Sequence, residues 1–292
     1  MRITQSMIAA NSLRNINQSY GKIVTSLEQM ASGKKISKPS DDPVIAQKGM
    51  YYRSNLNEVT QYNRNLSEVY LWMDNSEAAM EQANSNLQRI RELVVQAAND
   101  TNTDDDREAI AKEINQLKAD LVSVANTQVA GRYIFNGTNV KEAPVAIDDA
   151  GNVTVEAADS AYLVEVSRGT QLKANANLNA LLGQGMFNTI SNISAEMAKD
   201  EPDLDALLAD LDEYISSFSA ERSDLGARYN RLELLQSRII YQEELATKAM
   251  SDNEDVDLEK IISDYSNQKA VHEAALTVGA NLIQRSLVDF LR

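Results

Sequence analysis

Apolar residues recur at alternating steps of three and four between residues 59 and 97. The members of this row are Val59, Tyr62, Leu66, Val69, Met73, Ser76, Met80, Ala83, Leu87, Ile90, Val94 and Ala97. Ser76 is its one polar member, and the segment contains neither Gly nor Pro. A heptad row of this length predicts a long helix that packs against other helices along most of its length. The heptad period also predicts left-handed supercoiling.

Shorter apolar rows lie at both ends of the chain. The N-terminal row, within residues 1–32, consists of Ile3, Met7, Leu13, Ile16, Tyr20, Ile23, Leu27 and Met30. The C-terminal helix has two adjacent rows, which contain Val271, Ala275, Val278 and Leu282, and Leu276, Ala280, Ile283, Leu287 and Phe290, with Leu291 next to the end. Two adjacent rows make an apolar face too broad for one partner helix. We therefore predict that these residues form an assembly interface.

The N-terminal segment is also rich in Asn, Gln and Ser, which are weak helix formers. A helix of this kind is expected to be poorly ordered alone and to become helical when it packs against a partner. Permanent docking within the same molecule explains the N-terminal row equally well.

A turn is predicted between the first two helices. Gly33 is suited to the left-handed position that ends a helix, and Pro39 and Pro43 exclude a continuous helix. Asp42 before Pro43 indicates a helix start, with a capping carboxylate and a proline at the first helical position. Asp41 and Asp42 could also be read as metal ligands, but capping accounts for this pair more simply.

The rest of the chain predicts two further groups of helices around a β-rich segment. Helices are expected at residues 43–99 and 105–129, from about residue 186 to 250, and again after the acidic connector at 251–257. The acidic run at residues 99–106 lacks the spacing and central Gly of a calcium loop, and it suits the start of a helix. Strand-forming residues lie at 133–135 and 162–166, and residues 145–155 predict a hairpin.

These elements predict a mainly α protein in which long antiparallel heptad helices form a rod with a small inserted β-rich domain. Residues 1–42 and 253–292 are assigned to terminal assembly helices that form a coiled coil. Residues 43–134 and 188–252 are assigned to the rod, and residues 135–187 to the inserted domain. With about fifty residues, that domain is expected to need packing against the rod for part of its stability.

Composition argues against several classes of function. The chain of 292 residues has a net charge of −15, which disfavours nucleic acid and anionic membranes as partners. It has no Cys and one His, His272, so neither a metal centre nor a His-based catalytic site is expected. No phosphate-binding glycine loop is present, because Gly183 and Gly185 lack the residues that should follow them. We predict a non-enzymatic protein without cofactor. The N-terminus does not have the form of a Sec signal peptide.

Several segments together resemble the flagellin superfamily. They are residues 26–36, 41–43 and 86–97 in the first half of the chain, and residues 225–231 and 286–291 in the second. The resemblance covers both terminal regions in the same order. Within the superfamily, the turn at residues 38–43 and the segment at 131–138 are most similar to the proteins of the hook–filament junction, the third hook-associated proteins.

The resemblance implies an extracellular structural protein of the bacterial flagellum. Such a protein is exported without a Sec signal through the flagellar type III apparatus, with the help of a flagellar export chaperone. Its implied partners are the preceding, FlgK-like hook-associated protein, flagellin, and copies of itself in a ring. The terminal helices would line the axial core, and the β domain would project outward.

Two other functions remain in view. The chain could be a flagellin, the bulk subunit of the filament, which purified protein would reveal by seeding long filaments. It could also be a cytoplasmic signalling bundle, such as a chemoreceptor hairpin. That class has no inserted β domain, and residues 135–187 argue against it.

Overall fold

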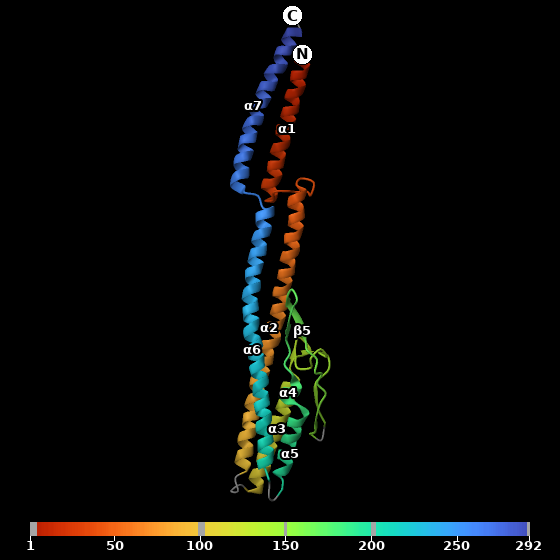
Figure 1. Ribbon diagram of the computed structural model, residues 1–292, viewed down its shortest axis with the longest axis vertical. Helices are drawn as coiled ribbons and strands as arrows, with labels where there is room; N and C mark the ends of the chain where they lie inside the picture. Colours follow the sequence, from red (N-terminus) through yellow and green to blue (C-terminus); the bar gives the residue numbers. More distant parts are fainter. Residues whose placement is uncertain (1–4, 99–102, 149–150, 200–202, 291–292) are drawn as a thin grey trace. The chain divides into compact units, whose positions relative to one another are not determined.

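The computed structural model describes residues 5–98, 103–148, 151–199 and 203–290. The chain divides into two compact units. The terminal unit, residues 1–58 with 242–292, contains α1 (Gln5–Ser32), α7 (Leu258–Phe290), the first turns of α2 (Pro43–Ala97) and the last turns of α6 (Asp205–Glu254). The central unit, residues 59–241, contains the remainder of α2 and α6, together with α3 (Asp104–Ala125), α4 (Leu178–Leu182), α5 (Gln184–Glu196) and six short strands (Figure 1).

The predicted heptad row of α2 forms the core of the central unit. Every member of the row is buried except Tyr62, which is partly buried and packs against the same core. Ser76 is fully buried, and its hydroxyl donates to the carbonyl oxygen of Trp72 at 2.9 Å. A satisfied hydroxyl avoids most of the cost of burying a polar group, which explains why a serine fits in this row.

The third helix starts as predicted but ends earlier. Thr103 caps α3 in a reciprocal capping box with Asp106. We expected the helix to continue to Val129, whereas α3 ends at Ala125. The reason is local: Asn126 donates from its side chain to the carbonyl of Val145, and the hydroxyl of Thr127 donates to the carbonyl of Val124. These bonds turn the chain into a strand instead of another helical turn.

The strands form three antiparallel pairs. β1 (Gln128–Val129) pairs with β2 (Arg132–Tyr133), β3 (Val145–Ile147) with β4 (Val153–Val155), and β5 (Leu163–Ser167) with β6 (Thr170–Lys173). The predicted hairpin at 145–155 is confirmed, and its register places Val145 opposite Val155. The strand predicted at 162–166 is displaced by one residue, and its partner β6 was not predicted.

The predicted β-rich segment, 135–187, differs from the structure at both edges. Strand structure begins at Gln128, and α4 and the start of α5 occupy residues 178–187. Asn177 starts α4 because its side chain accepts from the backbone N–H of Asn179 at 3.0 Å, and Leu178 and Leu181 are buried. Short apolar runs such as this one do not distinguish a strand from a buried helix by their pattern.

Trp72 joins α2 to the strand segment. Its indole N–H donates to the carbonyl of Ile134 at 3.2 Å, and its ring lies 5.1 Å from that of Tyr162. Tyr162 in turn donates to Glu68 on α2, and burial raises the pKa of its hydroxyl. The strand segment therefore shares one core with the helices.

Candidate functional site

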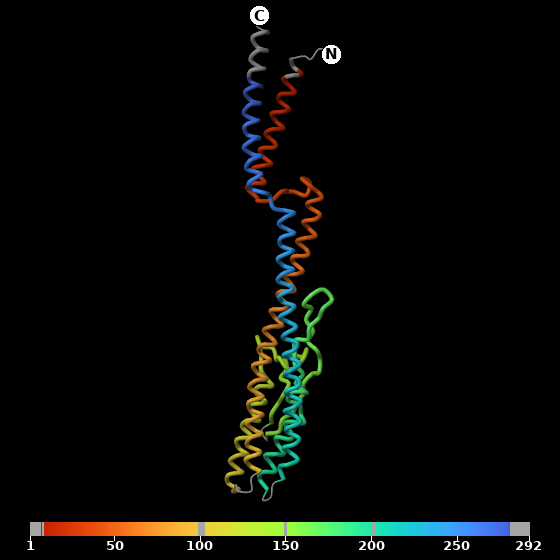
Figure 2. The backbone as a smooth tube through the Cα atoms, turned by 60° about the vertical axis from the view of Figure 1, so that its left-hand side comes forward, coloured from red at the N-terminus to blue at the C-terminus, as the bar shows by residue number. Residues whose placement is uncertain are grey.

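In the terminal unit, α1 and α7 lie side by side and run antiparallel, as both views show (Figures 1 and 2). Three contacts fix the pairing. The hydroxyl of Ser26 donates to the side chain of Gln268 at 3.2 Å, and the rings of Tyr20 and His272 are 6.0 Å apart. Gly279 lies so close to α1 that a Cβ atom there would be 3.1 Å from Ile16. Glycine at this position permits the close approach of the two helices.

The residues that α1 and α7 bury between them are mostly small or polar. Most buried and half-buried positions of α1 recur at steps of three and four, and they are Ala9, Ser12, Ile16, Ser19, Ile23, Ser26 and Met30. Gln29 is half-buried as well. The corresponding positions of α7 include Ile261, Gln268, His272, Ala275 and Gly279. Burying Ser, Gln and Gly removes little apolar surface from water, so this contact supplies only part of the stabilisation of an apolar heptad seam.

Many of the larger apolar residues of the predicted interface face solvent instead. On α1, Leu13 is 54% exposed and Tyr20 is 60% exposed; on α7, Val271 is 62% exposed. Met7, Leu27, Leu276 and Val278 are exposed as well. Of the predicted interface, Ile23 is buried, and Ile16, Met30 and Ala275 are half-buried. Ile16 lies against Gly279 of α7. The side chains of Ile3, Leu282, Ile283, Leu287, Phe290 and Leu291 lie outside the described residues.

The pair also has a polar flank. A groove of about 470 Å³ runs between the two helices, and its lining includes Gln18, Lys22 and Thr25 of α1 and Asp264 of α7. On the wheel of α1 these positions lie away from Leu13, Tyr20 and Leu27, which recur every seven residues. The helix pair therefore presents an apolar and a polar flank.

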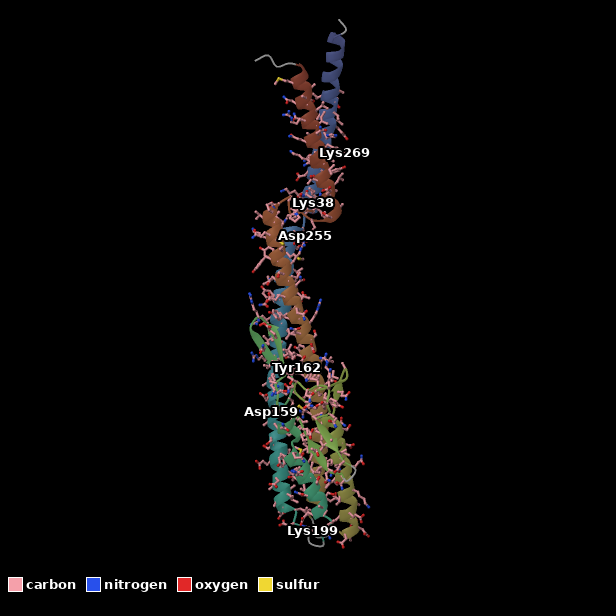
Figure 3. All side chains as sticks on the ribbon, turned by 90° about the vertical axis from the view of Figure 1, so that its right-hand side faces the viewer. Lys38, Asp159, Tyr162, Lys199, Asp255 and Lys269 are labelled. Carbon is pink, nitrogen blue, oxygen red and sulfur yellow. The ribbon has the colours of Figure 1, made fainter. Side chains whose placement is uncertain are left out.

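Two connecting segments of the terminal unit, residues 33–42 and 255–257, are joined to each other. The backbone N–H of Lys35 donates to the carbonyl of Glu254 at 2.7 Å, and that of Val256 donates to the carbonyl of Gly33 at 3.0 Å. Between these bonds Lys34 is paired with Asp255, and their side chains form an ion pair at 2.6 Å. Figure 3 labels Lys38 and Asp255 in these segments, which together with Glu254 we call the joint.

Glu254, the last residue of α6, is the buried acid of the joint. It is 4% exposed, and its Oε2 accepts from the guanidinium of Arg53 at 2.6 Å and lies 3.5 Å from the ammonium of Lys34. The hydrogen bond from Arg53 lowers the pKa of Glu254 despite its burial. The other oxygen, Oε1, lies against Gly49 on α2, where a Cβ atom would approach it to 2.7 Å.

The predicted cap and turn residues shape the backbone between α1 and α2. Gly33 has a φ of +69° and ends α1, with its N–H donating to the carbonyl of Gln29. Asp42 accepts from the N–H groups of residues 44 and 45 at the start of α2, whose first residue is Pro43. Asp41 accepts from those of residues 37 and 38 in the turn. Pro39 lies in the same turn and lines a small pocket beside α2.

The buried members of the joint were not found from the sequence. Glu254 lies in the run of residues 251–257, which the sequence predicts to be an acidic connector between two helices. The available signal was Gly49, a glycine inside a predicted helix, which often marks a close contact. No described helix has the length and apolarity needed to cross a membrane.

Comparison with known proteins identifies the family of this chain. The model of the bacterial flagellin N-terminal helical region matches residues 3–140, and that of the C-terminal helical region matches residues 208–291. Together they account for about three quarters of the sequence. The chain belongs to the flagellin superfamily. It is 28% identical to flagellar hook-associated protein 3 of Escherichia coli K12, over 94% of this chain and 95% of that protein. It is 26% identical to flagellin of Bacillus subtilis 168 over the full length of both.

Solved structures of hook-associated proteins share the fold of this flagellin-superfamily chain. A putative flagellar hook-associated protein from Vibrio parahaemolyticus matches with a TM-score of 0.67 and 23% identity, over 74% of this chain and all of the other. FlgL of Xanthomonas campestris matches with a TM-score of 0.63 and 18% identity, over 68% of this chain and 99% of the other. The resemblance and the fold class expected from the sequence are thereby confirmed.

Proposed function

We propose that this chain is a structural subunit of the bacterial flagellum, located at the junction between hook and filament and held to its neighbours by α1 and α7. The observation that carries this proposal is the distribution of side chains in the terminal helix pair. Small and polar residues such as Ser26 and Gln268 fill the contact within the chain, whereas Leu13, Tyr20 and Val271 face solvent.

Exposed side chains of this size favour association. Full burial of one such residue contributes about 1.5–3 kcal/mol, and the terminal pair exposes several of them along both helices. Association of copies in which these faces meet would bury apolar surface that a single chain leaves in water. The predicted division into terminal assembly helices, residues 1–42 with 253–292, and a helical rod is part of this proposal.

The position in the flagellum is supported by the relatives. The match to hook-associated protein 3 of Escherichia coli covers nearly the whole chain, and the matching structures include FlgL of Xanthomonas campestris. We infer the partners from this position: the preceding hook-associated protein on one side, flagellin on the other, and copies of this chain in a ring. Export through the flagellar apparatus with an export chaperone completes the proposal.

A pair of substitutions tests the role of the apolar flank. Leu13→Asp and the matched control Gln18→Asp are each expressed in cells that lack the native protein. The first should leave the melting temperature of the purified monomer within a few degrees of the native value and abolish incorporation into flagella, because it places a charge in the proposed interface. The control, on the polar flank, should incorporate. Normal incorporation of Leu13→Asp would contradict the proposal.

Flagellin is the second candidate, and the full-length match to the flagellin of Bacillus subtilis favours it. The two functions differ in self-assembly. Purified protein mixed with short filament fragments should elongate them into long filaments if it is a bulk subunit. A junction protein should add no more than a short cap, which electron microscopy of the filament lengths distinguishes.

A further inference from the structure

The central unit has an open groove between α2 and α6 that no part of the chain described by the structure fills. Its volume is about 1040 Å³. Its α6 wall contains the larger side chains of Arg222, Leu225 and Tyr229. It also contains a stripe of smaller residues at steps of four, three and four, which are Ser219, Ser223, Gly226 and Asn230. A stripe of small residues at heptad spacing lets the backbone of another helix approach closely. It runs from Ser219 to Asn230, which is about three helical turns.

The α2 wall of the groove is acidic. It presents Asp74 and Glu77, and Glu81 lies one turn further along the same helix. Arg222 of α6 pairs with both Glu77 and Glu81, so one cation serves two carboxylates. Asp74 accepts a hydrogen bond from the hydroxyl of Tyr229, which carries no charge to offset it. The groove therefore has an excess of negative charge and favours a basic occupant.

The terminal unit has an exposed helix face with one basic and two large apolar residues, which complement the acidic wall and the small residues of the groove. At the start of α2, Val44, Lys48 and Tyr51 are spaced by four and three residues, the spacing of the groove wall. Val44 is 59% exposed and Tyr51 is 69% exposed. Lys48 makes no ion pair with any residue that the structure describes.

The sequence as a whole has the same difference in charge between its N-terminal segment, which is basic, and its central unit, which is acidic. Residues 1–58 contain eight Lys and Arg against four Asp and Glu, whereas residues 59–241 contain fifteen against twenty-nine. A basic N-terminal segment and an acidic central unit on the same chain attract each other between copies. This complementarity selects a second copy as the occupant of the groove.

We propose that the groove between α2 and α6 seats the start of α2, residues 44–51, of a second copy. Val44 and Tyr51 would pack over the small residues of α6, and Lys48 would face the acidic wall. The contact is heterologous, because the face and the groove are different surfaces, so it can repeat from copy to copy around a ring. It rests on the proposed function, which brings copies side by side, and adds the surfaces through which they meet.

Engineered cysteines test this contact, since the chain has no Cys of its own. Tyr51→Cys and Ser223→Cys are combined in one chain, which is expressed in cells lacking the native protein. Sheared flagella and concentrated purified protein are then oxidised in parallel and separated without reductant. The control combines Tyr51→Cys with Gln82→Cys, an exposed position of α2 next to the groove wall.

Under this proposal the Tyr51→Cys/Ser223→Cys chain forms a ladder of covalent multimers, at least fivefold more than the control. A mixture of the two single variants forms dimers and nothing larger.

Absence of a ladder from flagella that contain the protein overturns the proposed contact while leaving the proposed function intact. Absence of the protein from flagella counts against the proposed function, and the purified sample then decides the contact: a ladder supports it, and none overturns it. Equal ladders in test and control also overturn it.

Discussion

The carboxylate of Glu254, at the end of α6, lies 2.6 Å from the guanidinium of Arg53 on α2. The same carboxylate reaches Lys34, which follows α1. One buried acid thus connects three segments of the terminal unit that are far apart in the sequence. The backbone pairing of residues 33–35 with residues 254–256 runs beside it. The helix pair α1–α7 is therefore anchored at its base by polar contacts, although its own seam is only weakly apolar.

Replacing this acid should destabilise the terminal unit. Glu254→Gln removes the charge that Arg53 and Lys34 share. We expect the free energy of unfolding at pH 7 to fall by about 1–2 kcal/mol. This value is smaller than for a fully buried ion pair because Arg53 is largely exposed and solvent screens its charge. Chemical denaturation followed by circular dichroism measures the change. Glu259→Gln, an exposed position without an ion pair among the described residues, is the control and should have little effect.

The difference in stability between the native protein and Glu254→Gln should shrink as the pH falls. The pKa of Glu254 is lowered by folding, chiefly through the Arg53 hydrogen bond, so its contribution is present above the ordinary value of 4.5. It is lost as the pH falls through the lower pKa of the folded state. The native protein and Glu254→Gln should therefore converge in stability in acid, and a difference that grows as the pH falls would contradict this assignment.

Gly49→Ala tests the packing of the same carboxylate. Alanine is favoured over glycine inside a helix by about 1 kcal/mol, but its Cβ would lie 2.7 Å from Oε1 of Glu254. We expect a net loss of stability of about 1 kcal/mol from displacing the buried ion pair. In a Glu254→Ala background the same substitution should be stabilising, because the obstacle is gone. Gly21→Ala, where no atom lies within 4 Å of the new Cβ, is the matched control.

Leu87→Asp should unfold the central unit. Leu87 is fully buried in the heptad row, and a carboxylate there would cost more than about 4 kcal/mol. Loss of cooperative thermal unfolding by circular dichroism is the expected result. Leu71→Asp, on the exposed face of the same helix, should melt close to the native temperature. Similar losses in the two variants would refute the assignment of the buried face.

Lys118 should make stability depend on pH in the alkaline range. Its ammonium is buried and donates to the carbonyl of Gly151 and the hydroxyl of Ser191, and burial lowers its pKa from the ordinary value of 10.5. Between the folded and unfolded pKa values the unfolded chain binds more protons, so stability attributable to Lys118 rises with pH. Denaturation of the native protein and Lys118→Met across this range measures it. The variant should lack this rise, and an equal rise in both would assign it to other groups.

The sequence identified the long helices because their signal is repeated many times. Each heptad of α2 supplies the same information as the last, so one serine in the row did not obscure it. The small strands were harder to place, because β1 and β2 have two residues each and depend on Asn126, Thr127 and the turn after them. Local hydrogen bonds of this kind leave no periodic trace in a sequence.

The terminal helices also have features that the sequence specifies and features that it does not. The sequence by itself determined which residues of the two ends are apolar, where α1 must end, and how α2 begins, since these follow from side-chain spacing and from the restricted backbones of Gly33 and Pro43. Only the tertiary structure decided which part of each row is used within the chain. At the close approach beside Gly279, Ile16 lies against α7 and Ile23 is buried, whereas Leu13 is 54% exposed. That choice depends on the distance and rotation between two helices more than two hundred residues apart, which the spacing of apolar residues along either helix does not specify.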